Sequence, residues 1–92
     1  MAVLLLTYDL NKEGNSKVDY KEFYKIRNTY AYARLSESSY ALYTSETPQM
    51  VFTKLRPHMD ANDHVYVINL KRPYTGFGPQ EVNDWLEKNL LY

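Results

Sequence analysis

Runs of apolar residues separated by polar turns divide the chain into short elements. The first run, Val3 to Tyr8, is continuous and is followed by turn-forming residues, which is typical of a strand buried on both faces. Residues 64–70, HVYVINL, are β-branched and aromatic and predict another strand with both faces covered. Between these strands, segments 29–35 and 38–45 are rich in tyrosine and alternate partly, so we expect a hairpin.

Three other stretches repeat apolar residues at intervals of three and four, which predicts amphipathic helices. The first spans 18–28, and its lysines lie mostly on the opposite side. The second begins at Thr47 and Pro48, a helix-start signal, and Pro57 predicts an irregular last turn. A third follows Pro79. The apolar stripes are Tyr20, Phe23 and Tyr24; then Val51, Phe52, Leu55 and Met59; then Val82, Trp85, Leu86 and Leu90.

The order of these elements is β-α-β-β-α-β followed by one more helix. This order predicts an α+β fold, a ferredoxin-like split β-α-β (βαββαβ) sandwich with an additional C-terminal helix. At 92 residues the chain suits a single domain over 1–92. Both crossover helices are expected on one sheet face. Either the last helix or a second molecule must cover the other face, and we expect a homodimer.

Composition narrows the class of protein. The chain is 45% hydrophobic and 24% charged, which is typical of a folded globule. It has no cysteine, which excludes disulfides, thiolate metal sites and thiol catalysis and favours the cytoplasm. Its N-terminal apolar run is too short for a signal peptide or a spanning helix, so no membrane contact is expected. Ten tyrosines favour contacts with a partner.

The balance of basic and acidic residues limits how the chain can bind nucleic acid. Eleven basic residues balance eleven acidic ones, so any contact with nucleic acid must be local. The basic face of the first helix is the cluster most worth testing, although most such faces are only solvated. Two basic residues just after the last strand extend the predicted phosphate-contacting set. The full set is Lys12, Lys17, Lys21, Lys25, Arg27, Lys71 and Arg72.

Asp9 ends the first apolar run and is the main candidate for chemistry. Such a carboxylate is a turn residue, a metal ligand or half of a catalytic pair. Asp60, Asn62 and Asp63 favour a helix-to-strand turn, because they lack the glycine and distant glutamate of a calcium loop.

Other polar and aromatic residues favour structural roles. His58 and His64 are not at zinc-ligand spacing, and no histidine base adjoins Ser38 or Ser39. The loop at 71–78 contains two glycines but is interpreted as a connection. Strand tyrosines can stack on bases, but dimer packing explains them better; they are Tyr8, Tyr40, Tyr43 and Tyr66.

Four segments carry a resemblance to known proteins: TYDLNKEG at 7–14, SESSYALYTS at 36–45, LRPHMDANDHVYVINL at 55–70 and GFGPQEVNDWLEKNL at 76–90. In order and spacing they resemble small bacterial and mobile-element proteins labelled SinR-family. More distantly they resemble the ferredoxin-fold CRISPR-associated spacer-acquisition subunit. In the latter, an aspartate at the end of the first strand faces its symmetry mate, and the pair is proposed to hold magnesium for phosphodiester cleavage. The resemblance implies that Asp9 is both catalytic and a ligand of Mg²⁺ in a homodimeric endonuclease.

Two functions follow as hypotheses. The first is a nucleic-acid-associated homodimer with metal-dependent endonuclease activity. The second is a non-catalytic protein-interaction module, a regulator or inhibitor from a mobile element or phage, whose tyrosine-rich surface binds a protein partner. Salt-dependent affinity for oligonucleotides distinguishes them, because phosphate neutralisation makes binding fall steeply with salt and binding to a protein surface need not behave so.

Overall fold

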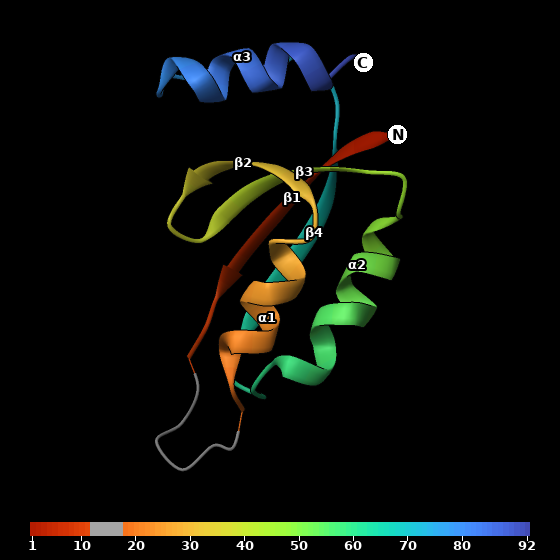
Figure 1. The fold of residues 1–92 in the computed structure, drawn as a ribbon, viewed down its shortest axis with the longest axis vertical. Coiled ribbons are helices and arrows are strands. Elements are labelled where there is room, and N and C mark those ends of the chain that lie inside the picture. Colours follow the sequence, from red (N-terminus) through yellow and green to blue (C-terminus); the bar gives the residue numbers. More distant parts are fainter. Residues whose placement is uncertain (12–17) are drawn as a thin grey trace.

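The computed structural model describes residues 1–11 and 18–92, and in these residues it forms a four-stranded sheet and three α-helices (Figure 1). The strands are β1 (Ala2–Asp9), β2 (Ala31–Ser36), β3 (Ser39–Thr44) and β4 (His64–Leu70). The helices are α1 (Tyr20–Arg27), α2 (Pro48–Leu55) and α3 (Gln80–Asn89), and a 3-10 turn, η1 (Arg56–His58), extends α2. The predicted α+β ferredoxin-like class is confirmed.

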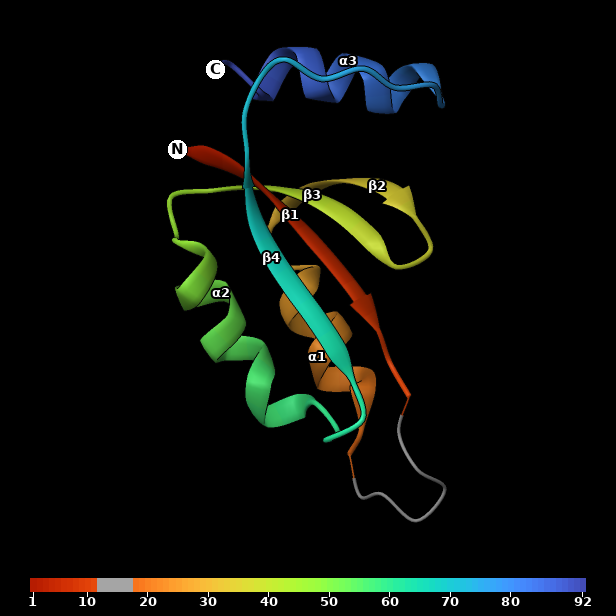
Figure 2. The same ribbon diagram turned by 180° about the vertical axis from the view of Figure 1, so that it is seen from behind.

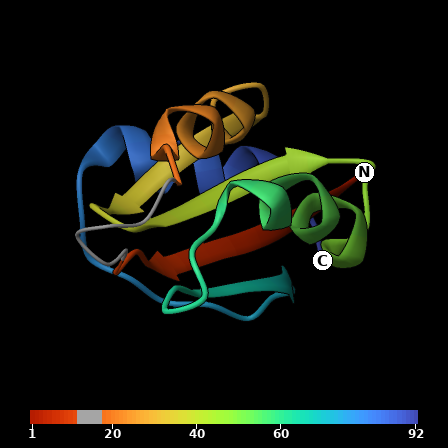
Figure 3. The ribbon, with the colours of Figure 1, turned by 90° about the horizontal axis from the view of Figure 1, so that it is seen from below.

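The sheet has the strand order β2-β3-β1-β4, which is visible from below in Figure 3. All neighbouring strands are antiparallel. β1 is a central strand, because it pairs with β3 on one side and with β4 on the other. This is the order of a split β-α-β arrangement, in which each crossover helix joins two strands that flank a third.

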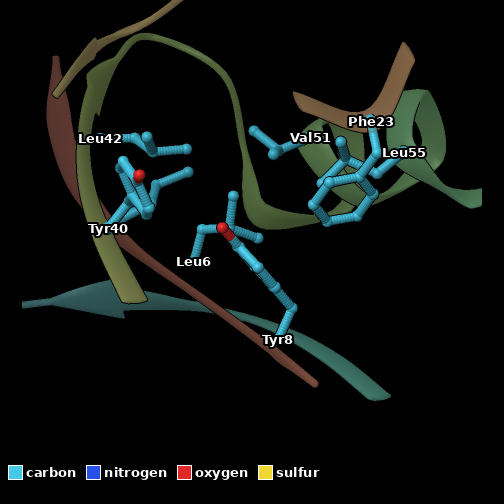
Figure 4. Packing of buried hydrophobic residues seen from close by; sticks show 8 residues of the cluster. Leu6, Tyr8, Phe23, Tyr40, Leu42, Val51 and Leu55 are labelled. Atoms are coloured by element: carbon cyan, nitrogen blue, oxygen red, sulfur yellow. The ribbon is translucent and has the colours of Figure 1, made fainter. Parts of the chain in front are cut away.

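Helices α1 and α2 lie side by side on one face of the sheet, which we call the first face (Figures 1 and 2). The main core forms there, and Figure 4 shows Phe23 of α1 and Leu55 of α2 facing Leu6 and Tyr8 of β1. The placement of both crossover helices on one face is therefore as predicted. The buried members of this core are Leu4, Leu6, Tyr8, Phe23, Tyr40, Leu42, Val51 and Leu55.

Local capping sets where the helices begin. Helix α1 is shorter than the predicted 18–28, because Asp19 is its N-cap and accepts a hydrogen bond from the amide of Lys21 at 2.9 Å. Helix α2 begins as predicted, with the Thr47 hydroxyl accepting from the amide of Met50 at 3.2 Å. The irregular last turn predicted from Pro57 is the 3-10 turn η1.

The opposite, second face of the sheet is covered only in part. Helix α3 lies across one end of the sheet, where Val3, Ala41 and Leu90 form a second small core (Figure 1). Trp85 is partly buried against this core, in keeping with its predicted packing role. The guanidinium of Arg72 fastens the end of α3, since its Nε donates to the carbonyl of Leu90 at 2.5 Å.

Of the two predicted covers for the second face of β4, the last helix does not reach the middle of the strand, and cover by a second molecule stays a prediction. Val65 and Val67 pack against the first-face core, but Tyr66 and Ile68 on the other face are 65% and 49% exposed. The reason is geometric: β4 is an edge strand, and α3 crosses the sheet only beyond this region. The last helix thus covers one end of the second face and leaves the rest open.

Candidate functional site

Asp9 is the last residue of β1 and lies directly opposite His64 of β4. It is exposed, and the alternation of side chains along β1 places it on the second face, two residues beyond Thr7. Its backbone carbonyl accepts a hydrogen bond from the Asn11 side chain at 3.2 Å. Within residues 1–11 and 18–92, no hydrogen bond or ion pair to its carboxylate is seen. The loop after Asp9 runs into residues 12–17, outside the described residues, so the turn alternative for Asp9 stays a prediction. The amide of Asn11 in that loop is bound by another aspartate.

That aspartate is Asp63, which is almost completely buried just before β4. Its Oδ1 accepts from the amide of Asn11 at 2.5 Å and from the hydroxyl of Tyr20 at 2.6 Å, and its Oδ2 accepts from the amide of Asp60 at 2.7 Å. Burial by itself raises the pKa of the Asp63 carboxyl, but these three hydrogen bonds outweigh burial and hold the pKa below its ordinary value. The helix-to-strand turn predicted at 60–63 is confirmed.

An open hollow of about 650 Å³ lies where β1 ends, and we call it the β1 hollow. Asp9 is on its wall. The other polar and aromatic residues that line it come from β1, α1 and the β2–β3 hairpin; they are Tyr8, Tyr24, Arg27, Arg34, Glu37, Ser38 and Tyr40. Among the described residues, four formally charged side chains, two of each sign, therefore line this space.

The guanidinium of Arg27 is held firmly in this hollow. Its Cζ lies 4.3 Å from the ring centre of Tyr40 and 4.8 Å from that of Tyr24, within the range of cation–π attraction. Its Nη1 donates to the Tyr8 hydroxyl at 2.7 Å, and its Nε donates to Asn28 at 3.1 Å. Burial raises the pKa of the Tyr8 hydroxyl, while Arg27 opposes this rise, so Tyr8 stays a neutral acceptor at neutral pH.

Arg34 is the second cation of the hollow and was not among the predicted site residues. It is exposed, lies opposite Tyr40 in the hairpin register, and donates from Nε to the carbonyl of Ser36 at 3.3 Å. In the described part of the chain, neither Arg34 nor Arg27 forms an ion pair with a carboxylate. A regular hairpin closed by Ser36 and Ser39 would pair residue 35 with Tyr40. The bulge between Arg34 and Ser36 shifts this register, so no local signal in the sequence indicates that Arg34 lies opposite Tyr40.

The predicted basic residues are not all brought together. Arg27 joins the β1 hollow, whereas Lys21 and Lys25 are exposed on α1. Lys71 is exposed directly after β4, and Arg72 is bound to Glu87 of α3 at 2.9 Å. Lys12 and Lys17 lie outside the described residues, so their predicted contacts are not placed. That these basic residues contact phosphate stays a prediction.

The described residues were compared with the arrangement of side chains that a metal ion needs. Among residues 1–11 and 18–92, no group of three or more His, Asp or Glu side chains is arranged to hold an ion. Ser38 lines the β1 hollow, and the Ser39 hydroxyl is 2.9 Å from that of Thr7. Within these described residues, Asp9 is therefore not part of such a group.

The uncovered part of the second face is an apolar patch, which we call the open patch. It consists of Leu5 and Thr7 of β1 with Ile68 and Tyr66, their respective pairing partners on β4. The tyrosine and isoleucine are exposed, and Leu5 and Thr7 are partly exposed. Asp9 continues the same face at the edge of this patch.

Comparisons with known proteins add no relative. No family model, curated protein or solved structure matches the chain. The resemblance to SinR-family proteins and to the CRISPR-associated subunit therefore stays a prediction. Among the described helices, none is both long and apolar enough to cross a membrane.

Proposed function

We propose that this protein binds nucleic acid through the β1 hollow, with Arg27 and Arg34 contacting backbone phosphates. The observation that carries the proposal is the fixed guanidinium of Arg27, which two tyrosine rings and the Tyr8 hydroxyl orient in an open space. A guanidinium that is already ordered loses little side-chain entropy when it binds a phosphate.

The balance of charge in the hollow is compatible with this role. Asp9 and Glu37 line it together with the two arginines, and the whole chain has a formal net charge of zero. Direct pairing would neutralise the guanidinium groups, but within the described residues neither pairs with a carboxylate. Affinity therefore rests on a few local phosphate contacts and is sensitive to salt.

We further propose that two copies associate through the open patch. A two-fold dimer presents the same surface from both copies, and the centre of this patch is uncharged and apolar. Burying Tyr66 and Ile68 removes apolar surface from water on both sides. Because Asp9 lies on the same face, it would stand at the rim of such an interface.

The magnesium-dependent endonuclease hypothesis depends on this dimer. Among the described residues the β1 hollow offers two carboxylates, Asp9 and Glu37, and no third His, Asp or Glu side chain joins them. Two copies of Asp9 brought together are the arrangement that the hypothesis requires. Cleavage is therefore tested separately from binding.

The second candidate function is a protein-interaction module, and the open patch favours it. An exposed apolar patch that contains an aromatic side chain also fits a different protein partner. This candidate predicts no salt-dependent binding to oligonucleotides and a chain that stays monomeric by itself.

Oligonucleotide binding at increasing salt tests the first proposal. We expect Arg34→Gln to weaken binding by about tenfold at low salt and to reduce the slope of affinity against salt by about one contact. Arg56→Gln is the matched control, because Arg56 is also exposed and lies on η1, away from the β1 hollow. Equal effects of the two substitutions, or no binding at low salt, contradict the proposal.

A further inference from the structure

A second concave surface lies beneath α3, and we call it the α3 groove. Its volume is about 590 Å³, and it is bounded by α3, the ends of β2 and β4, and the loop at 71–79. Five apolar side chains are among its lining residues, and Leu35 is the exposed one of them; they are Leu35, Leu70, Val82, Leu86 and Leu90. A groove of this size with several apolar lining residues suits a flat ring system of small-molecule dimensions.

Phe77 stands at the edge of this groove and is fully exposed. It therefore contributes nothing to the cores of the chain. Gly76 and Gly78 flank it, and a Cβ placed on either glycine would meet no atom within 4 Å. The aromatic ring is thus exposed to solvent between two residues without side chains, and both of its faces are accessible.

Two cations lie on the wall of the same groove. Lys71 follows β4, and Arg34 comes from β2; both are exposed, and neither is paired with a carboxylate within the described residues. The third cation, Arg72, is paired with Glu87, whose other oxygen accepts a hydrogen bond from the Tyr74 hydroxyl at 2.8 Å. The groove therefore offers positive charge beside an exposed aromatic ring.

Arg34 connects the two concave surfaces. It lines the β1 hollow, where Arg27 is held, and it also lines the α3 groove, where Phe77 stands. One ligand that touches Arg34 can extend into both spaces. Arg34 is thus a cation shared by the linings of the two concave surfaces.

We propose that the α3 groove binds the unpaired bases of a single-stranded nucleic acid, with one base stacked on Phe77. This inference rests on the proposed function and specifies its ligand. Phosphates on either side of the stacked base contact Lys71 and Arg34, and the strand continues into the β1 hollow. A base inside a duplex is already stacked between its neighbours and cannot place a face against Phe77.

Strands of matched length test the inference. The probes are an oligothymidylate, its ribose counterpart, an abasic strand with the same number of phosphates, and a duplex. We expect the wild-type chain to bind both base-bearing single strands at least tenfold more tightly than the abasic strand or the duplex. The comparison of the DNA and RNA strands identifies which sugar is preferred.

Substitutions of Phe77 separate stacking from simple apolar contact. Phe77→Leu keeps apolar volume and Phe77→Trp keeps an aromatic face, so we expect the leucine variant to lose about tenfold in affinity and the tryptophan variant to retain it. Neither should change thermal stability, because Phe77 packs against no core. Met50→Ala, which shortens an exposed apolar side chain on α2, is the control and should have no effect on binding.

The outcomes distinguish this inference from the function on which it rests. If Arg34→Gln weakens binding but Phe77→Leu does not, or if the abasic strand and the duplex bind as well as the base-bearing strands, phosphate binding stands and the stacking site is overturned. If no strand binds at low salt, the proposed function itself fails.

Discussion

The carboxylate of Asp63 accepts a hydrogen bond from the hydroxyl of Tyr20 at 2.6 Å, joining the turn before β4 to the first residue of α1. The same carboxylate holds the backbone amide of Asn11 where the chain leaves β1. Three segments that are distant in sequence therefore meet on one buried acid. This contact fixes the end of the molecule at which Asp9 lies.

The first prediction concerns this acid and pH. Because the folded state lowers the pKa of Asp63, its contribution to stability is complete above the carboxyl's ordinary pKa of 3.8 and is lost as the pH falls through the lower folded-state value. Asp63→Asn should lower the free energy of unfolding by about 1–3 kcal/mol at neutral pH and flatten its acid dependence. Urea denaturation at several pH values measures both effects. Asp84→Asn on the exposed surface of α3 is the control and should do neither.

A second prediction concerns the orientation of Arg27. Tyr8→Phe removes the hydroxyl that accepts from Nη1 of Arg27 but leaves the ring in the core. We expect a loss of about 1 kcal/mol in stability and a several-fold loss in oligonucleotide affinity, although no charge is changed. Denaturation and salt-dependent binding measure the two effects. Unchanged affinity in a folded Tyr8→Phe variant would show that the ordering of Arg27 does not matter for binding.

The third prediction addresses self-association. Ile68→Asp places a charge in the open patch and should shift the dimer to monomer by at least tenfold in dissociation constant. Met50→Asp is closely matched, because Met50 is 50% exposed and Ile68 is 49% exposed, and it lies on α2. Sedimentation equilibrium measures the association of both variants. A wild-type chain that is monomeric at every concentration tested would exclude the proposed interface.

The fourth prediction isolates the chemistry assigned to Asp9. If the endonuclease hypothesis holds, Asp9→Asn should abolish magnesium-dependent cleavage of a labelled strand while leaving the thermal midpoint unchanged, because the carboxylate is exposed. Glu37→Gln removes the other carboxylate of the β1 hollow and should reduce cleavage less. Cleavage that survives in the Asp9→Asn variant would rule out this role.

The local elements follow from the sequence because their causes are local. Thr47 and Pro48 mark the beginning of α2, and Pro57 predicts the change to a 3-10 turn, since each acts on backbone groups within one helical turn. The alternation and apolar runs likewise predict four strands and the α+β class. These features depend on residues that are adjacent in the chain, and adjacent residues can be read directly from the sequence.

The site depends on strand register and on which elements cover each face of the sheet, and both arise only when distant segments pack together. Arg27 and Arg34 share a hollow because the hairpin register places Arg34 opposite Tyr40, whose ring also contacts Arg27. The sequence predicts the apolar stripe of α3 but not that the helix crosses only one end of the second face. Helix formation is fixed within a few residues, whereas docking depends on contacts between segments tens of residues apart, which no local pattern encodes.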